Sequence, residues 1–201
     1  MRLWVFFFVV LGLSGLVFQS NAHGQIVDFR QDNVASFFFG DFVGNHSFDS
    51  NGLIFDITSP NPVGAINITP STQVNLNDID RIEVTAFVGS GNLDDLFFFV
   101  DEDGTSERFV YSIPADQFVE NTFTTVSIAT TDEFATIFPG NGVLDGNLIN
   151  VGFAPPPIGQ SLGRTHFAVQ SLAFVAVPEP NSILLIFALT NLVVIRRTRR
   201  I

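Results

Sequence analysis

The sequence contains no cysteine and no lysine in 201 residues, and it has only one methionine, one tryptophan and one tyrosine. The absence of cysteine excludes disulfides, thiolate metal sites and a cysteine nucleophile. All nine basic residues are therefore arginine. A folded domain of this composition must draw its stability from its hydrophobic core, helped at most by a bound ion.

Positive charge is scarce in the middle of the chain. Nineteen of the twenty acidic residues lie in 25–177 with only four arginines, so this segment carries a net charge of about −15. The four are Arg30, Arg81, Arg108 and Arg164. Such a surface repels nucleic acids and anionic lipid headgroups, which excludes nucleic acid as a partner. It suits divalent cations and neutral polymers, and it also keeps an exported protein soluble.

The first 24 residues have the pattern of a secretory signal peptide. Arg2 precedes an apolar run from Val5 to Phe18, and small residues follow at Ala22 and Gly24. A charged start, an apolar run and a small-x-small site predict cleavage by signal peptidase between Gly24 and Gln25. A competing cut after Ala22 fits the same rule, and an uncleaved membrane helix is the remaining alternative.

The segment 178–201 has three parts: Pro178-Glu179-Pro180, an apolar stretch over 182–195, and the arginine cluster Arg196, Arg197, Arg199 and Arg200. The apolar stretch is shorter than the about 20 residues of a comfortable membrane span. Flanking arginines and local thinning of the bilayer nevertheless allow a short transmembrane helix. The arginine cluster is expected to stay in the cytoplasm, which places 25–177 outside the inner membrane.

These three parts, in this order, resemble the PEP-CTERM sorting signal of Gram-negative bacteria that make exopolysaccharide. The resemblance covers 178–201 and implies that the protein is an exosortase substrate. An exosortase-type membrane protease would recognise Pro178-Glu179-Pro180 and remove the tail. The chain would then be anchored in the inner membrane only transiently, before release to the cell surface or extracellular matrix. A plain tail anchor is the alternative.

Residues 25–177 alternate between apolar and polar side chains in short runs separated by Gly, Asn, Asp and Pro, which is typical of β-strands. Leu96–Val100 is apolar throughout and predicts a strand buried on both faces. The chain is therefore expected to be all-β, with one antiparallel sandwich over 25–177 between the signal helix and the short transmembrane helix. The other expected strands are Leu53–Ile57, Ala65–Ile68, Ile82–Val88, Arg108–Ile113, Thr124–Ile128, Leu148–Phe153 and Phe167–Val175.

The order of features from 76 to 177 resembles carbohydrate-binding jelly rolls with a galactose-binding-type fold. The resemblance implies a jelly-roll-like sandwich and a carbohydrate ligand, such as extracellular polysaccharide. The matching parts are the strand Ile82–Val88, the turn Gly91-Asn92, the strand Leu96–Val100 with Asp101-Glu102-Asp103-Gly104, the strand Arg108–Ile113 and Phe123.

Two candidate sites can be drawn from the residues alone. Asp101 and Asp103 lie in an acidic loop whose carboxylates suit Ca²⁺, while the alternative is a plain hairpin turn around Gly104. Ser161 lies in Gly159-Gln-Ser-Leu-Gly163, which fits the nucleophile-elbow expression. That motif needs a strand before the serine and a helix after it, whereas prolines precede Ser161 and a strand is expected to follow. The sequence therefore predicts no catalytic residue and no cofactor other than Ca²⁺.

The resulting hypothesis is an exported, non-enzymatic β-sandwich protein associated with the cell surface or the exopolysaccharide matrix. A carbohydrate-binding module is the main alternative, and a secreted glycan hydrolase with an unrecognised acid pair is the third. Sugar-binding domains commonly stack pyranose rings on exposed Trp or Tyr. Here Trp4 lies in the leader, Tyr111 lies on a face expected to point inward, and the phenylalanines are mostly expected in the core, which argues against the carbohydrate-binding alternative.

Overall fold

The computed structural model describes residues within 25–176 and omits several short connections. The described ranges are 25–30, 35–40, 46–59, 64–71, 73–91, 94–103, 107–133, 135–137, 140–157, 160–161, 163 and 165–176. The expected signal peptide, the tail at 178–201 and the turn residue Gly104 lie outside the described residues, and so does Gly24 of the expected cleavage site. Among the residues that are described, no helix is long and apolar enough to cross a membrane.

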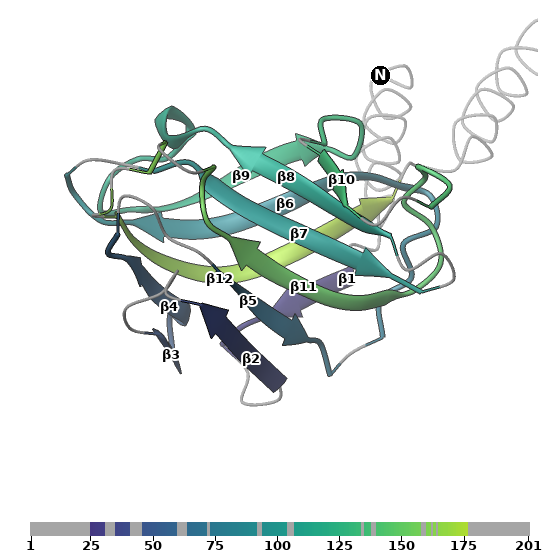
Figure 1. Ribbon diagram of the computed structural model, residues 1–201, viewed down its shortest axis with the longest axis horizontal. Helices are drawn as coiled ribbons and strands as arrows, with labels where there is room; N and C mark the ends of the chain where they lie inside the picture. The colour runs from purple at the N-terminus through teal and green to yellow at the C-terminus, as the bar shows by residue number, and fades with distance from the viewer. Residues whose placement is uncertain are drawn as a thin grey trace, which may run out of the picture. The chain divides into compact units, whose positions relative to one another are not determined.

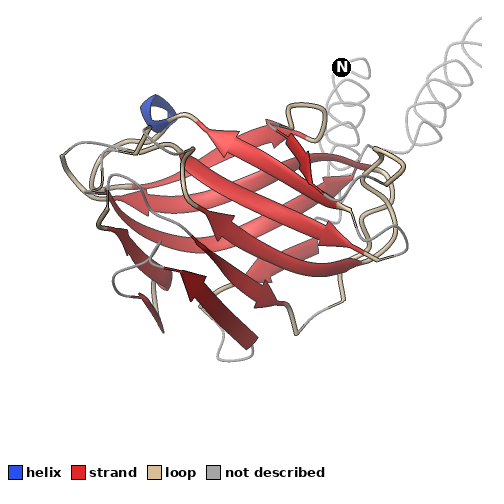
Figure 2. Cartoon of the chain, viewed as in Figure 1, coloured by secondary structure: helices blue, strands red, loops and turns tan. Residues whose placement is uncertain are grey.

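The described chain is an antiparallel sandwich of two six-stranded sheets (Figures 1 and 2). Sheet 1 has the order β3-β4-β12-β6-β9, with β1 also paired to β12, and sheet 2 has the order β10-β8-β7-β11-β5-β2. The strands of sheet 1 are β1 (Gln25–Asp28), β3 (His46–Asp49), β4 (Gly52–Ile57), β6 (Ile79–Val88), β9 (Phe123–Ala129) and β12 (Thr165–Ala176). Those of sheet 2 are β2 (Ala35–Gly40), β5 (Gly64–Thr69), β7 (Leu96–Glu102), β8 (Arg108–Ile113), β10 (Ala135–Ile137) and β11 (Leu148–Ala154).

The expectation of an all-β antiparallel sandwich is confirmed for the described part of the chain, where one 3-10 turn, Ala115–Gln117, is the only helical element. Each of the eight expected strands is present, with ends shifted by a few residues at most. Leu96–Val100 is buried on both faces, as its apolar run predicts. The four strands that the sequence pattern did not reveal are β1, β2, β3 and β10, and all of them have six residues or fewer.

The hydrophobic core lies between the two sheets and is built largely from phenylalanine. The Phe55 ring of sheet 1 packs against Phe153 of sheet 2 with centroids 5.3 Å apart, and it packs equally closely against Phe167. Tyr111 is fully buried and stacks on Phe98 at 5.2 Å. Aromatic pairs of this kind add about 0.5–1.5 kcal/mol each beyond the area that they bury. The core therefore takes the place of the disulfides that this chain cannot form.

At two β-bulges the side chains face the opposite way from the orientation that alternation predicts. The alternation from Phe167 to Val175 predicted that Ser171 and Ala173 face the core together with Phe167. A register shift between Val169 and Ser171 reverses the faces, so that Leu172 and Phe174 are buried instead. A second shift between Leu148 and Asn150 leaves Ile149 exposed, although alternation predicted it to lie with Val151. An extra residue in one strand changes which face the following side chains occupy.

Candidate functional site

The outer face of sheet 2 carries a row of polar side chains across four neighbouring strands. Arg108 of β8 pairs in register with Asp101 of β7, and Asp101 pairs with Asn150 of β11. Thr69 of β5 extends the row, because its hydroxyl donates to the Asn150 side-chain oxygen at 2.7 Å. Three strand spacings of 4.7–4.9 Å give this row a length of about 14 Å. We call Arg108, Asp101, Asn150, Thr69 and the adjacent Asn67 the polar row.

Arg108 holds the polar row together. Its Nε and Nη2 atoms donate to the two carboxylate oxygens of Asp101 at 2.6 and 2.7 Å, and Nη2 also reaches the side-chain oxygen of Asn67 at 3.3 Å. The paired Arg108 and Asp101 side chains are 21% and 15% exposed. A two-pronged, charge-assisted contact of this kind fixes the plane of the guanidinium as well as its position. The row thus presents donors and acceptors in a set geometry.

A small apolar cluster lies under the polar row on the same outer face. Phe99 is 1% exposed, and the Arg108 guanidinium lies 3.8 Å from the centroid of its ring. Gly152 leaves room for that ring, since a Cβ at this position would lie 2.1 Å from Phe99 Cζ. Ala65 and Val110 complete the buried part of the cluster. Phe99 therefore supports Arg108 from below and offers no ring face to a ligand.

The two residues predicted to bind calcium face different partners. Asp101 belongs to the polar row, whereas both carboxylate oxygens of Asp103 accept hydrogen bonds from Asn147, one from its backbone amide at 2.7 Å and one from its side chain at 3.0 Å. These bonds lower the pKa of Asp103 below its usual value. No group of three or more His, Cys, Asp or Glu in the described part of the chain is placed to hold a metal ion. A calcium ion at Asp101 and Asp103 stays a prediction.

Two buried glutamates near this hairpin were not singled out from the sequence. Glu102 and Glu107 are 0% and 1% exposed. Glu102 accepts a hydrogen bond from the backbone amide of Asp145 at 2.8 Å, and Glu107 accepts one from Gly142 at 3.0 Å. Together with Asp103 they fasten the loop 140–147 to the ends of β7 and β8. Since buried carboxylates need such partners, their role here is structural.

The serine of the elbow-like segment is engaged in local contacts. The Ser161 hydroxyl donates to the carbonyl oxygen of Ser59 at 3.2 Å and accepts the backbone amide of Gly163 at 3.0 Å. The segment leads directly into the strand β12. A nucleophile elbow instead needs a helix after its serine. The geometry therefore assigns Ser161 to fixing this loop against Ser59.

Comparison with known proteins does not assign the chain to a family. No family model matches the sequence, and no curated protein matches it. Among solved structures, the chain is similar to the family 11 carbohydrate-binding module from Clostridium thermocellum in complex with a β-1,3-1,4-mixed-linked tetrasaccharide, at 15% identity and a TM-score of 0.46, over 78% of this chain and 98% of that one. It is also similar to the xylan-binding module CBM86 from Roseburia intestinalis, at 11% identity and a TM-score of 0.40, over 77% of this chain and 96% of that one.

A third similar structure is an enzyme, the apo Crh5 transglycosylase. The identity is 12% and the TM-score is 0.45, over 77% of this chain and 85% of the transglycosylase. Binding modules and an enzyme thus occur among structures of comparable similarity, and all of these TM-scores are below 0.5. The comparisons therefore assign neither a ligand nor a reaction to this chain, and its function has to be argued from its own surface.

Proposed function

We propose that the sandwich is a non-catalytic carbohydrate-binding module that takes a neutral polysaccharide on the outer face of sheet 2. The observation that carries this proposal is the polar row, in which Arg108, Asp101 and Asn150 stand side by side on adjacent strands. Sugars are recognised through many hydroxyl groups, each of which donates and accepts. A row that alternates donors with acceptors at fixed positions suits such a ligand, because little side-chain entropy is lost when it binds.

The net charge of the domain favours a neutral polysaccharide over an anionic one. The segment 25–177 carries about −15, so an anionic polysaccharide would be repelled. Within the polar row, the positive charge of Arg108 is already neutralised by Asp101 at 2.6 Å. The row therefore offers hydrogen bonds without an excess of either charge, which favours an uncharged chain of hexoses or pentoses.

The proposal includes the route that the sequence indicates for the whole protein. The leader ending at Gly24 supports export, and the segment 178–201 supports anchoring and removal by an exosortase-type protease. An exported module that binds neutral polysaccharide belongs at the cell surface or in the exopolysaccharide matrix. The binding proposal and the sorting proposal are independent, since the first depends on the described strands and the second on the two ends of the sequence.

Binding of the full chain to a soluble neutral β-glucan, measured by calorimetry, tests the proposal. We expect wild-type protein to bind the glucan and Arg108→Lys to weaken binding about tenfold or more, because lysine keeps the charge but loses the two-pronged contact with Asp101 and the guanidinium that lies over Phe99. Ser127→Ala, an exposed hydroxyl on β9 of the opposite sheet, is the matched control and should bind like wild type.

Two results would contradict the proposal. One is equal affinity of wild type and Arg108→Lys for every neutral glucan that binds. The other is the appearance of shortened chains when the glucan is incubated with the protein, because this would show a hydrolase or transglycosylase in place of a binding module. A polyanionic glycan such as polygalacturonate serves as the charge control and should not bind at low salt.

A further inference from the structure

The outer face of sheet 1, on the opposite side of the sandwich, carries an apolar row across four strands. Ile54 of β4 pairs with Ala168 of β12, Ala168 pairs with Phe87 of β6, and Phe87 pairs with Phe123 of β9. The immediate neighbours of these residues along each strand, such as Ala86 and Val88, face the core, so the row points outward. We call Ile54, Ala168, Phe87 and Phe123 the aromatic strip.

The aromatic strip ends at Phe123, whose side chain is partly exposed to solvent. Phe123 is 37% exposed, and its ring lies 5.6 Å from that of the partly buried Phe87. The backbone of the preceding turn is fixed, because the amide of Asn121 donates to the carbonyl oxygen of Val88 at 2.8 Å. A large apolar side chain that a fixed backbone keeps exposed to water carries an unfavourable hydration free energy. Burying it against a ligand is therefore favourable, which suits it to a binding contact.

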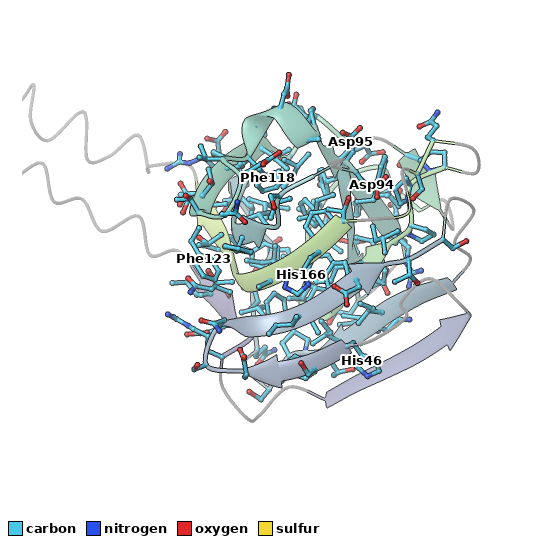
Figure 3. All side chains as sticks on the ribbon, turned by 90° about the vertical axis from the view of Figure 1, so that its left-hand side faces the viewer. His46, Asp94, Asp95, Phe118, Phe123 and His166 are labelled. Carbon is cyan, nitrogen blue, oxygen red and sulfur yellow. The ribbon has the colours of Figure 1, made fainter. Side chains whose placement is uncertain are left out.

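Polar side chains border the strip on both sides. On one side His166 Nδ1 lies 2.5 Å from Asp56 Oδ1, and the His166 ring meets Phe87 edge to face with centroids 6.3 Å apart. On the other side the hydroxyls of Thr85 and Thr125 share a hydrogen bond of 2.9 Å. In Figure 3, Phe123 and His166 lie between Asp94 and Asp95 above and His46 below.

We propose that the aromatic strip is a second carbohydrate-binding surface, which holds the apolar face of a neutral pyranose chain on Phe123 and Phe87. The C–H groups of a pyranose ring form an apolar face, while its hydroxyls project around the rim. An apolar centre bordered by Asp56 and His166 on one side and by Thr85 and Thr125 on the other matches that division. Phenylalanine here takes the stacking role for which the domain has no tryptophan and no exposed tyrosine.

Charge complementarity selects this occupant over others. The four residues of the strip carry no charge, and the Asp56 carboxylate at its border is hydrogen-bonded to His166, so the strip itself has no ionic group to attract a charged ligand. The acidic domain around it repels anionic polymers, and two copies of so acidic a chain repel one another. An uncharged, hydroxyl-rich chain is therefore the partner that the surface fits.

This inference depends on the proposed function only in taking the same class of ligand. It adds the ability to link two polysaccharide chains, which a single site cannot provide. Polar row and aromatic strip lie on the outer faces of different sheets, so one domain can hold two polysaccharide chains at once. Such a protein links chains into a network, and multivalent contacts of this kind raise the overall affinity for a matrix.

Stoichiometry and light scattering with the same soluble β-glucan test the inference on the full chain. We expect wild type to bind short oligosaccharides of this glucan at two sites per protein and to raise light scattering with the long polymer. Phe123→Ala should leave one site and abolish the rise in scattering. Phe123→Tyr should restore both, because it keeps the ring. Ile149→Ala removes an apolar side chain of similar exposure from sheet 2 and should behave like wild type.

The outcomes separate this inference from the proposed function. If Phe123→Ala still binds at two sites, the inference that the strip binds carbohydrate is wrong. It is also wrong if wild-type protein is a dimer that Phe123→Ala dissociates, since the strip would then hold a second copy of the chain. Loss of all binding in Arg108→Lys with none lost in Phe123→Ala overturns the strip and leaves the polar row standing. The reverse pattern leaves the strip standing and overturns the polar row.

Discussion

The Arg108 guanidinium lies over the Phe99 ring, with its Cζ 3.8 Å from the ring centroid, and in this position it also donates to both carboxylate oxygens of Asp101. The Phe99 ring occupies the space above Gly152 that a side chain would otherwise fill. The missing side chain at Gly152 on β11 therefore determines how far above the sheet Arg108 of β8 lies. The contact of Arg108 with Asn67 adds β5 to the same arrangement. Four strands of sheet 2 therefore determine the position of one charged side chain.

Replacing Gly152 with alanine is expected to destabilise the fold. The new Cβ would lie 2.1 Å from the carbonyl oxygen of Ile66 and 2.1 Å from Phe99 Cζ, and backbone cannot move away without disturbing the sheet. Overpacking typically costs about 1–3 kcal/mol, and we expect the upper part of that range. Denaturant unfolding of Gly152→Ala measures the change. Ser112→Ala on β8 is the control, and an equal stability of the two variants would contradict the prediction.

Tyr111 makes the domain sensitive to strong alkali. Burial, with the negative charge of Glu133 as a second cause, raises the pKa of Tyr111 well above its usual value of 10.0. The unfolded chain therefore releases this proton more readily than the folded one, so stability is full below pH 10 and falls as the pH rises beyond it. Because Tyr111 is the only tyrosine, tyrosinate absorbance should appear together with loss of β-sheet circular dichroism. Ionisation of the Tyr111 phenol at its usual pKa, with the β-sheet circular dichroism unchanged, would contradict the prediction.

Asp103 makes the stability of the domain depend on pH in the acid range, through its hydrogen bonds to the loop 140–147. The hydrogen bonds from Asn147 lower the pKa of Asp103 in the folded protein, so its contribution to stability is present above the unfolded pKa of about 3.9. That contribution is lost as the pH falls through the lower folded value. We expect Asn147→Ala to reduce stability at neutral pH and to flatten the acid limb of the stability profile. Asn141→Ala in the same loop is the control, and parallel acid limbs in wild type and Asn147→Ala would contradict the prediction.

The proposed calcium ion at Asp101 and Asp103 makes a separate prediction. Millimolar calcium should raise the melting temperature by mass action, and Asp103→Ala should abolish the rise. Arg108 and Asn147 already occupy both carboxylates, so an ion would have to displace these partners. A rise of equal size in wild type and Asp103→Ala would exclude this loop, and magnesium at the same concentration is the control for ionic strength.

The tail hypothesis predicts a mass for the mature protein. Removal by an exosortase-type protease should leave surface-released protein without Arg196–Ile201, and smaller than the precursor from which only the leader has been cut. Intact-mass measurement decides this, and Glu179→Ala should stop the processing. A mass that still includes the arginine cluster would mean a plain membrane anchor.

Local alternation was sufficient to locate the longer strands, because a strand half buried in a sandwich shows its period over several residues. The same rule failed at Ile149 and Ser171, where bulges depend on a partner strand that local sequence does not specify. β3 was missed for a related reason. His46–Asp49 is short, mostly exposed and polar, so it has no apolar periodicity to detect.

The candidate surfaces could be predicted from the sequence only in part. The outward orientation of Phe87, opposite to Val88, follows from alternation alone. Its neighbours do not, since Phe123 and Ala168 come from distant parts of the chain and join Phe87 only through strand register. Arg108 and Asn67 are likewise 41 positions apart. The neighbours on a sheet face depend on strand register, and for strands far apart in the sequence no short turn fixes that register.

The strand β12 contributes Ala168 to the aromatic strip and His166 to its border, and the chain passes from the end of this strand at Ala176 into the tail sequence. A polysaccharide held on the strip and an anchor beyond Ala176 would thus pull on a single strand, along its length. β12 is hydrogen-bonded to β6 on one side and to β4 and β1 on the other. Tension in this direction would shear both ladders at once and load their hydrogen bonds together, so β12 would resist extraction more strongly than a strand whose bonds break one after another.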